Sequence, residues 1–118
     1  MSVEKWSESV TIVHLGSDPH FSEDIETATE LTGGSVNRVL DFSAVHYVNS
    51  SNIAALLRLR RQVAEKNGKV VLCNVANAVW TTFLITGLDK IFDFSENVPT
   101  ALATIQMKNP NQLRDAAE

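Results

Sequence analysis

Cysteine is almost absent from this chain of 118 residues, which has a single one, Cys73. One thiol cannot form an internal disulfide, and it cannot assemble a metal site built from several thiolates. Cys73 ends the apolar run Val70 to Cys73, where a thiol usually serves as a small buried hydrophobe. We therefore expect no disulfide framework, no metal cluster and no reactive cysteine.

Long apolar segments are also missing. No run approaches the ~20 residues that a helix needs to cross a bilayer. The first ten residues, MSVEKWSESV, contain two glutamates and lack the apolar stretch of a secretory signal. We therefore expect a cytoplasmic protein without membrane insertion.

The sequence has no excess of basic residues, because its net charge is −4. Binding to nucleic acid requires a concentrated basic surface that releases counterions from phosphates. Arg58, Arg60 and Arg61 form the one local basic group, and on a helix they indicate a solvated face. Nucleic acid is therefore not an expected partner.

Sequence motifs of the common catalytic sites are missing as well, including the nucleophile elbow, the Walker loop and the zinc-protease helix. His14, His20 and His46 do not have the spacing of metal ligands, so we expect surface or hydrogen-bonded structural roles for them. The acidic residues at 23, 24 and 26 fall within one helical turn. We expect them to stabilise the positive end of a helix dipole rather than to act as a catalytic acid–base pair. The chain is predicted not to be an enzyme.

The sequence does contain a regular alternation of strand and helix patterns. Strands are predicted at 9–16 and at 38–48, the second bent between Asp41 and Ser43, and an edge strand at 91–94. The continuous apolar run 69–75 predicts a strand covered on both faces, at the centre of the sheet. This order is typical of a single α/β domain in which helices pack against one sheet.

Four helices are expected between and after these strands. Ser22 predicts the cap of a short helix that runs towards residue 31. Helical spacing of apolar residues between 53 and 63 predicts a long amphipathic helix that starts after Asn49 and is closed by Gly68. Asn77 predicts the cap of a third helix, which Gly87 ends.

The fourth helix is expected to begin at Pro99 and to run to about residue 106. The remaining residues, 107–118, are polar and are predicted to form a frayed tail. We therefore expect one domain over residues 1–106.

A polar quartet, Asn49-Ser50-Ser51-Asn52, lies between a predicted strand and the start of the long helix. The positive end of the helix dipole and its free backbone N–H groups lie there. One polar side chain is enough to cap the helix, at a gain of about 1 kcal/mol. The quartet therefore either caps the helix, with more polar residues than a cap requires, or forms a functional surface.

The segment VLDFSAVHYVNSSN, followed by IAALLRLRRQ, resembles the anti-sigma factor antagonists of the STAS domain family. Their signature is a strand reading roughly V-x-L-D-[LF]-S, followed by D-S-[ST]-G and a helix. A second stretch resembles the family at the correct distance, with Gly68 to Leu72, Ala78-Val79, Phe83, Gly87-Leu88, Phe92 and Ala101. The resemblance extends from about Val10 to Ile105, and implies a STAS-like domain with a mixed four- to five-stranded sheet and about four helices.

The resemblance also implies a function, which is partner switching. In such proteins the first serine of the motif is phosphorylated by an anti-sigma factor that is also a serine kinase, and the unphosphorylated form binds that factor. The acceptor would be Ser50, with Ser51 as the alternate. The implied partner-binding residues are Asp18, Asn49, Ser50, Ser51 and Asn52. Trp80 is a further candidate, at a position where family members often have a polar side chain. No cofactor is implied, and the protein is expected to be a monomer or weak dimer.

Two positions depart from the family signature, because Asn49 replaces its aspartate and Asn52 replaces its glycine. These departures favour an alternative in which the domain is a non-phosphorylated scaffold in a sensory assembly or transport system. A third hypothesis makes Ser50 a hydrolytic nucleophile, but the sequence offers no matched base for it. Trp80 is either packed against the sheet or an exposed aromatic anchor.

Overall fold

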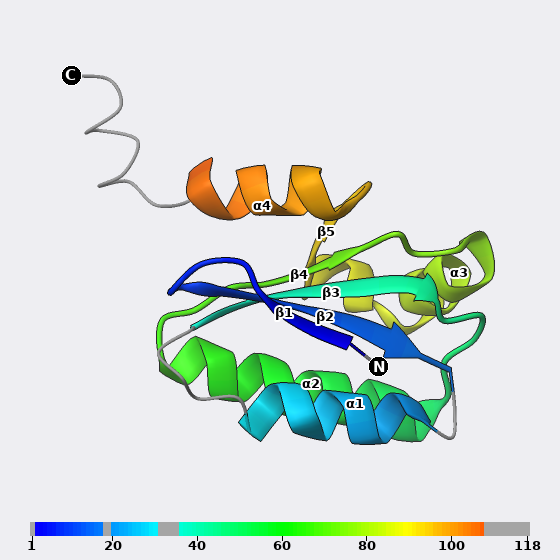
Figure 1. Cartoon of the computed structure of the whole chain (residues 1–118). Coiled ribbons are helices and arrows are strands. Elements are labelled where there is room, and N and C mark those ends of the chain that lie inside the picture. The colour runs from blue at the N-terminus through cyan, green and yellow to red at the C-terminus, as the bar shows by residue number, and fades with distance from the viewer. Residues whose placement is uncertain (1, 18–19, 31–35, 108–118) are drawn as a thin grey trace.

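The computed structural model describes residues 2–17, 20–30 and 36–107. Figure 1 labels the elements in chain order. They are β1 (Ser2–Lys5), β2 (Val10–Gly16), α1 (His20–Glu30), β3 (Asn37–Ala44), α2 (Ser50–Glu65), β4 (Val70–Cys73), α3 (Asn77–Thr86), the short 3-10 helix η1 (Leu88–Lys90), β5 (Asp93–Ser95) and α4 (Val98–Met107). None of the helices among these described residues is long and apolar enough to span a membrane.

One mixed sheet of five strands organises the domain, in the order β1-β2-β3-β4-β5. β1 is antiparallel to β2, and all other neighbours are parallel. Helices α1 and α2 lie against one face, α4 covers the other, and α3 lies near one end of the sheet (Figure 1). This arrangement confirms the predicted fold class, an α/β domain with four helices around a mixed sheet.

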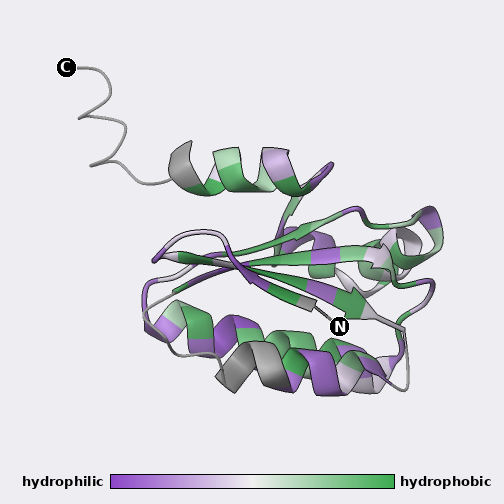
Figure 2. Cartoon of the chain, viewed as in Figure 1, coloured by the Kyte–Doolittle hydropathy of each residue, from purple (hydrophilic) through white to green (hydrophobic). Residues whose placement is uncertain are grey.

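Alternating residues of the strands divide the interior into two apolar clusters. Val13, Leu40 and Leu72 pack on the face covered by α1 and α2, and Val39 and Val71 pack under α4. The strands are accordingly mostly green in Figure 2, with a short hydrophilic band in β2 and in β3. Both sides of the parallel strands are therefore buried, which explains why β4 is a continuous apolar run.

The second strand differs from the prediction. β3 continues to Ala44, and the residues from Val45 to Val48 form no strand, so the predicted extended piece there was wrong. The expected irregularity between Asp41 and Ser43 is present as a shift in register against β2 rather than as a break. Pairing with β2 resumes after the shift, at Ala44 opposite Gly16. Within the shifted segment, Asp41 Oδ1 accepts a hydrogen bond from the Ser43 N–H at 3.0 Å.

Two features of the sheet were not predicted correctly. β1 was missed, because its residues Glu4 and Lys5 are exposed and the segment carries no alternating apolar pattern. The strand 69–75 was expected at the centre of the sheet, but β3 occupies the centre. The edge strand was expected at 91–94, and it lies at Asp93–Ser95 after η1.

Helix starts were the weakest part of the sequence prediction. α1 begins at His20, so Ser22 lies inside its first turn and is not the cap. Asp24 is buried and accepts a hydrogen bond from the N–H of Gly16 at 2.9 Å, so it joins the helix to β2 instead of facing the helix dipole. The cap position of α3 is Ala76, which makes no side-chain cap bond, so the predicted Asn77 cap was wrong.

Helix ends agree better with the prediction. Gly87 closes α3 in the left-handed conformation, with φ of 79°. The end of α2 differs, because Asn67 takes the left-handed conformation there, with φ of 61°. Gly68 has another role: a Cβ at this position would come within 2.0 Å of the Val36 carbonyl oxygen. The predicted tail, 107–118, lies outside the described residues except for Met107, the last residue of α4.

A polar network crosses the sheet on the face covered by α4. His14 on β2 lies between two carboxylates, with Nδ1 2.6 Å from Asp41 Oδ2 and Nε2 2.9 Å from Glu4 Oε1. Asp41 Oδ1 accepts hydrogen bonds from Asn74 Nδ2 and from the backbone N–H of Ser43. The network therefore joins β1, β2 and β3 to the residue that follows β4, and it gives His14 the hydrogen-bonded role that was expected.

This network changes the titration of both charged partners. Burial disfavours the charged form of His14, but its bonds to Asp41 and Glu4 outweigh that effect and raise the pKa above 6.5. Burial also acts against the charged form of Asp41, but hydrogen bonds from Asn74, Ser43 and His14 lower its pKa. A doubly protonated imidazole donates to both carboxylates, whereas the neutral ring can donate to only one.

The free energy of unfolding should therefore fall as the pH rises above about 6.5, the ordinary pKa of histidine, and through the raised pKa of His14 in the folded chain. The pKa of His14 is higher in the folded chain than in the unfolded chain, so its contribution is complete below about pH 6.5 and is lost above the folded value. Urea unfolding across this range measures the slope. His14→Gln should remove this part of the slope, and His46→Gln, at an exposed histidine, should retain it. Equal slopes in all three proteins would contradict this role.

Candidate functional site

The polar quartet lies at the edge of the sheet where the parallel strands end. β3 ends at Ala44, five residues are not in regular structure, and α2 begins at Ser50. The start of α3 follows β4 at the same edge, because the carboxyl ends of parallel strands lie together. Ligands and partners of α/β sheets commonly bind at this edge.

Asn49 and Asn52 form a reciprocal cap at the start of α2. Asn49 is extended, and its Oδ1 accepts a hydrogen bond from the Asn52 N–H at 2.9 Å. Asn52 Oδ1 accepts one from the Asn49 N–H at 3.1 Å. This is a capping box, with asparagine in the third helical position where glutamate or glutamine is usual. The two residues that depart from the family signature therefore act as one unit.

Ser50 and Ser51 lie between these two asparagines and are both exposed. Within the part of the chain that the structure describes, neither hydroxyl makes a hydrogen bond to another residue. The cap is supplied by the asparagines, so the serines are not needed for it. They stand in the first turn of α2, where the helix dipole favours negative charge.

The four residues of the quartet do not form a uniform surface. Asn49, Ser50 and Ser51 are exposed, whereas Asn52 is 0% exposed. Asn52 lies on the buried face of α2, and its side chain accepts the hydrogen bond from the Asn49 N–H. Its contribution at this surface is therefore indirect, through the position of Asn49.

A hydroxyl joins the loop after β2 to the loop after β3. Ser17 Oγ donates to the Ala44 carbonyl at 3.2 Å and accepts from the His46 N–H at 3.0 Å. The end of β2 is thereby fixed beside the segment that leads to Ser50. Asp18, the predicted site residue of this loop, lies outside the described residues.

Trp80 is partly buried on α3. Its ring lies edge-on to Phe94 of β5, with 5.0 Å between ring centroids. The same two rings border an open cleft of about 470 Å³, together with Asn74, Val75 and Ser95. Trp80 therefore packs against the sheet and also presents an aromatic surface at its carboxyl edge.

Two features near the site were missed in the sequence. Tyr47 is 51% exposed between β3 and Ser50, whereas its neighbour Val45 is fully buried. Asp41, within the strand of the signature, is the acceptor that joins His14 to Asn74. Strand alternation would put Val45 and Tyr47 on the same face, so the sequence gives no signal for the exposure of Tyr47. Nothing in the sequence indicates the partners of Asp41.

Cys73 is confirmed as a buried thiol. It donates to the Leu40 carbonyl at 3.6 Å. Burial, together with the negative charge of Asp41, raises its pKa to about 12, so the thiolate is not populated near neutral pH.

The model of the STAS domain family matches residues 7–101. The chain belongs to the STAS domain family. Candidate anti-sigma factor antagonist BtrV of Bordetella bronchiseptica is 26% identical over 87 residues, which cover 74% of this chain and 75% of BtrV. The resemblance seen in the sequence is thus confirmed over both of its motif regions.

Solved structures share this STAS fold. A candidate anti-sigma factor antagonist from Thermotoga maritima has a TM-score of 0.77 and 15% identity, covering 88% of this chain and 92% of that one. The phosphorylated form of the Bacillus cell fate determinant SpoIIAA has a TM-score of 0.64 and 16% identity, covering 88% and 97%. The sheet and its helices are therefore those of the STAS domain.

Replacing Asn49 by alanine should lower the free energy of unfolding by about 1 kcal/mol, because the Asn52 N–H loses its acceptor. Asn49→Asp is the matched control, since it retains an acceptor and adds a negative charge at the positive end of α2. Its stability should equal or exceed that of the wild type. Urea unfolding measures all three proteins, and an equal loss in both variants would show that the cap does not depend on this acceptor.

Proposed function

We propose that this STAS domain is an anti-sigma factor antagonist that works by phosphorylation-controlled partner switching at Ser50. The observation that carries the proposal is the exposure of Ser50 in the first turn of α2, at the position of the signature serine. The partner would be an anti-sigma factor with serine kinase activity. It would bind the unphosphorylated chain and release it after transferring the γ-phosphoryl group of ATP to Ser50 Oγ.

The electrostatics of the helix start are compatible with both states. A phosphate adds about −1.5 to −2 charges. The positive end of α2 stabilises negative charge, and the cap between Asn49 and Asn52 leaves the Ser50 hydroxyl outside its hydrogen bonds. The domain can therefore accept the charge and remain folded. A partner docked over the same helix end would face repulsion and the cost of desolvating the phosphate.

The proposed partner surface extends beyond the acceptor. Asn49 and Ser51 flank Ser50 and are exposed with it. Trp80 borders the cleft at the end of β4 and β5, where an apolar side chain of the partner would fit against the two aromatic rings. Asp18 belongs to the proposal because the family often has an acidic residue after the first strand, and Asn52 contributes by holding Asn49.

A second candidate function is a scaffold that binds its partner without phosphorylation. Asn49 favours it, because an amide cannot take up the serine proton as the family's aspartate carboxylate could. In this case Ser50 would be a surface residue beside the docking site, and a negative charge placed at this position would not control binding.

The test of phosphorylation uses the anti-sigma factor that binds this chain, has serine kinase activity and is encoded in the same genome. Incubation with ATP should add one phosphate to the wild type and to Ser51→Ala, and none to Ser50→Ala. Intact mass and peptide mapping report the site. An unmodified wild type in a stable complex with an active kinase would exclude switching and favour the scaffold.

Partner affinity provides a separate prediction. Ser50→Ala should bind as the wild type does, and Ser50→Asp should bind at least about tenfold more weakly, or about 1.4 kcal/mol. Ser9→Asp is the matched control, because it adds the same charge at an exposed position at the opposite edge of the sheet. Calorimetric titration measures the affinities. Equal affinity for all four proteins would contradict charge control at Ser50.

A further inference from the structure

The cleft beside Trp80 has room for more than one side chain. It lies where β4 and β5 end, at the same edge of the sheet as the start of α2. Its volume of about 470 Å³ is within the range of about 300 to 1,000 Å³ typical of ligand pockets. We call it the Trp80–Phe94 cleft. Its lining residues are Asn74, Val75, Trp80, Phe94, Ser95 and Glu96.

Part of the lining is aromatic and anchored to the core. The rings of Trp80 and Phe94 lie edge to face, and Phe94 also contacts the buried Phe83, with 5.6 Å between ring centroids. Trp80, Phe94 and Val75 are only partly buried, so they keep apolar surface open to the cleft. This part of the cleft suits an apolar side chain.

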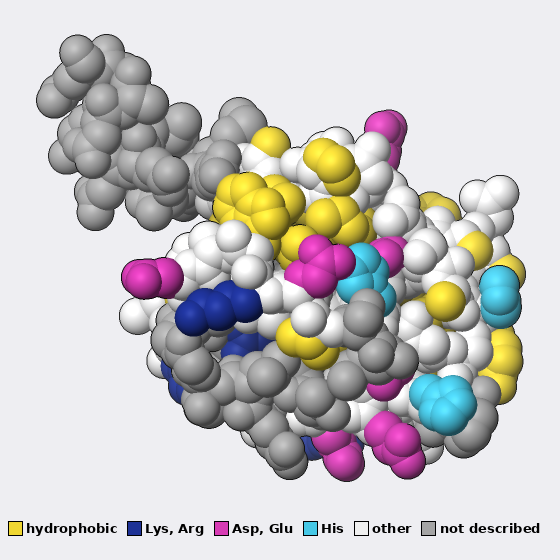
Figure 3. All heavy atoms as spheres, in the orientation of Figure 1, with side chains coloured by type: hydrophobic (Ala, Val, Ile, Leu, Met, Phe, Trp, Pro, Cys, Tyr) yellow, Lys and Arg dark blue, Asp and Glu magenta, His cyan; other side chains and the backbone are white. Residues whose placement is uncertain are grey.

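The charge of the lining is negative. Glu96 is exposed, and it is the one charged residue among the lining residues. Its carboxylate makes no hydrogen bond or ion pair to another described residue. On the face that Figure 3 shows, no described Lys or Arg side chain lies at the right-hand end, where the parallel strands end. The Glu96 carboxylate is therefore available to a cation from outside the domain.

Asn74 holds the ends of the strands together beside this carboxylate. Its backbone is left-handed, with φ of 57°, a conformation that asparagine tolerates. Its Nδ2 donates to Asp41 Oδ1 at 2.9 Å, and its N–H donates to the Glu96 carbonyl at 3.2 Å. These bonds join the end of β4 to β3 and to the residue after β5. A ligand in the cleft therefore has few groups to order besides the Glu96 side chain.

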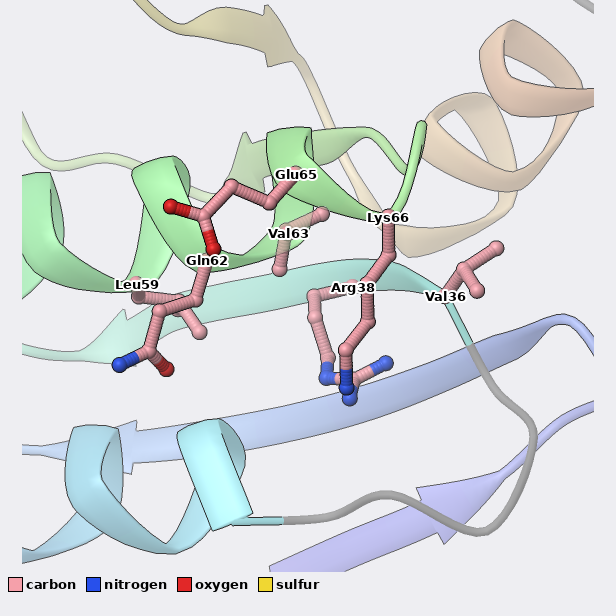
Figure 4. A pocket seen from close by; sticks show the side chains of 7 residues that line it. All are labelled: Val36, Arg38, Leu59, Gln62, Val63, Glu65 and Lys66. Carbon is pink, nitrogen blue, oxygen red and sulfur yellow. The ribbon is translucent and has the colours of Figure 1, made fainter.

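The cleft at the last turns of α2 lacks this combination (Figure 4). Charged side chains of both signs line it, from Arg38, Glu65 and Lys66. Arg38 is 4% exposed and donates to a backbone carbonyl, so its guanidinium is engaged within the domain. The Trp80–Phe94 cleft instead joins aromatic surface to an available charge of one sign.

We propose that the Trp80–Phe94 cleft binds a segment of the protein partner in which an apolar side chain is next to an arginine. The apolar side chain contacts the two rings, and the guanidinium pairs with Glu96. Arginine fits better than lysine, because its planar group can make two hydrogen bonds to a carboxylate. Glu96 repels a segment with an acidic residue at this place. This inference rests on the proposed function, since the segment belongs to the partner that binds at Ser50.

The test titrates the ¹⁵N-labelled full chain with N-acetyl-leucyl-arginine amide at constant ionic strength. Saturable shifts at millimolar peptide should be concentrated in the amides of residues 74–75 and 94–96 and in the indole N–H of Trp80. The indole of Trp6, an exposed residue between β1 and β2, is an internal control and should not shift. Absence of saturable shifts, or equal shifts of both indoles, would overturn the proposal.

The contribution of charge is measured with N-acetyl-leucyl-citrulline amide, which has a similar shape and no charge. It should bind about two- to fivefold more weakly than the arginine peptide, the range expected for an exposed ion pair. Glu96→Gln should abolish this difference. Glu65→Gln removes an exposed acid outside the cleft and should retain it. Equal binding of the two peptides to the wild type, or equal effects of the two variants, would contradict the role of Glu96.

The contribution of the apolar side chain is measured with N-acetyl-glycyl-arginine amide. This peptide keeps the cation but cannot contact the rings, so it should bind more weakly than the leucyl peptide. Equal affinity would contradict the aromatic half of the site. None of these titrations involves phosphorylation of Ser50, so the peptide results and the kinase results can fail separately.

Discussion

The candidate site depends on the reciprocal hydrogen bonds between Asn49 and Asn52 at the start of α2. These bonds satisfy backbone N–H groups that a helix start otherwise leaves without partners. They also make the two departures from the STAS signature mutually dependent, because each asparagine supplies the acceptor that the other requires. Ser50 and Ser51 are therefore held on an ordered helix end without taking part in its cap.

The rest of the fold positions this helix end at the carboxyl edge of the sheet. The network around Asp41 fixes β3 against its neighbours just before the loop that leads to Ser50. Ser17 then joins that loop to the end of β2.

Sequence patterns predicted the elements with a strong local signal, such as the helical periodicity of α2 and the continuous apolar run of β4. They failed where tertiary contacts decide. β1 is polar and depends on pairing with β2 and on the contact between Glu4 and His14. The family resemblance located Ser50, but the buried position of Asn52 required the structure.

In the proposed function, the cap of α2 and the acceptor Ser50 are separate features of one helix end. Amide hydrogen exchange of Asn49 and Asn52, before and after phosphorylation of Ser50, tests it most directly. The account predicts that both amides stay protected, because their acceptors are the asparagine side chains. Loss of protection on phosphorylation would contradict it, since the phosphate would then have replaced the cap and altered the start of α2.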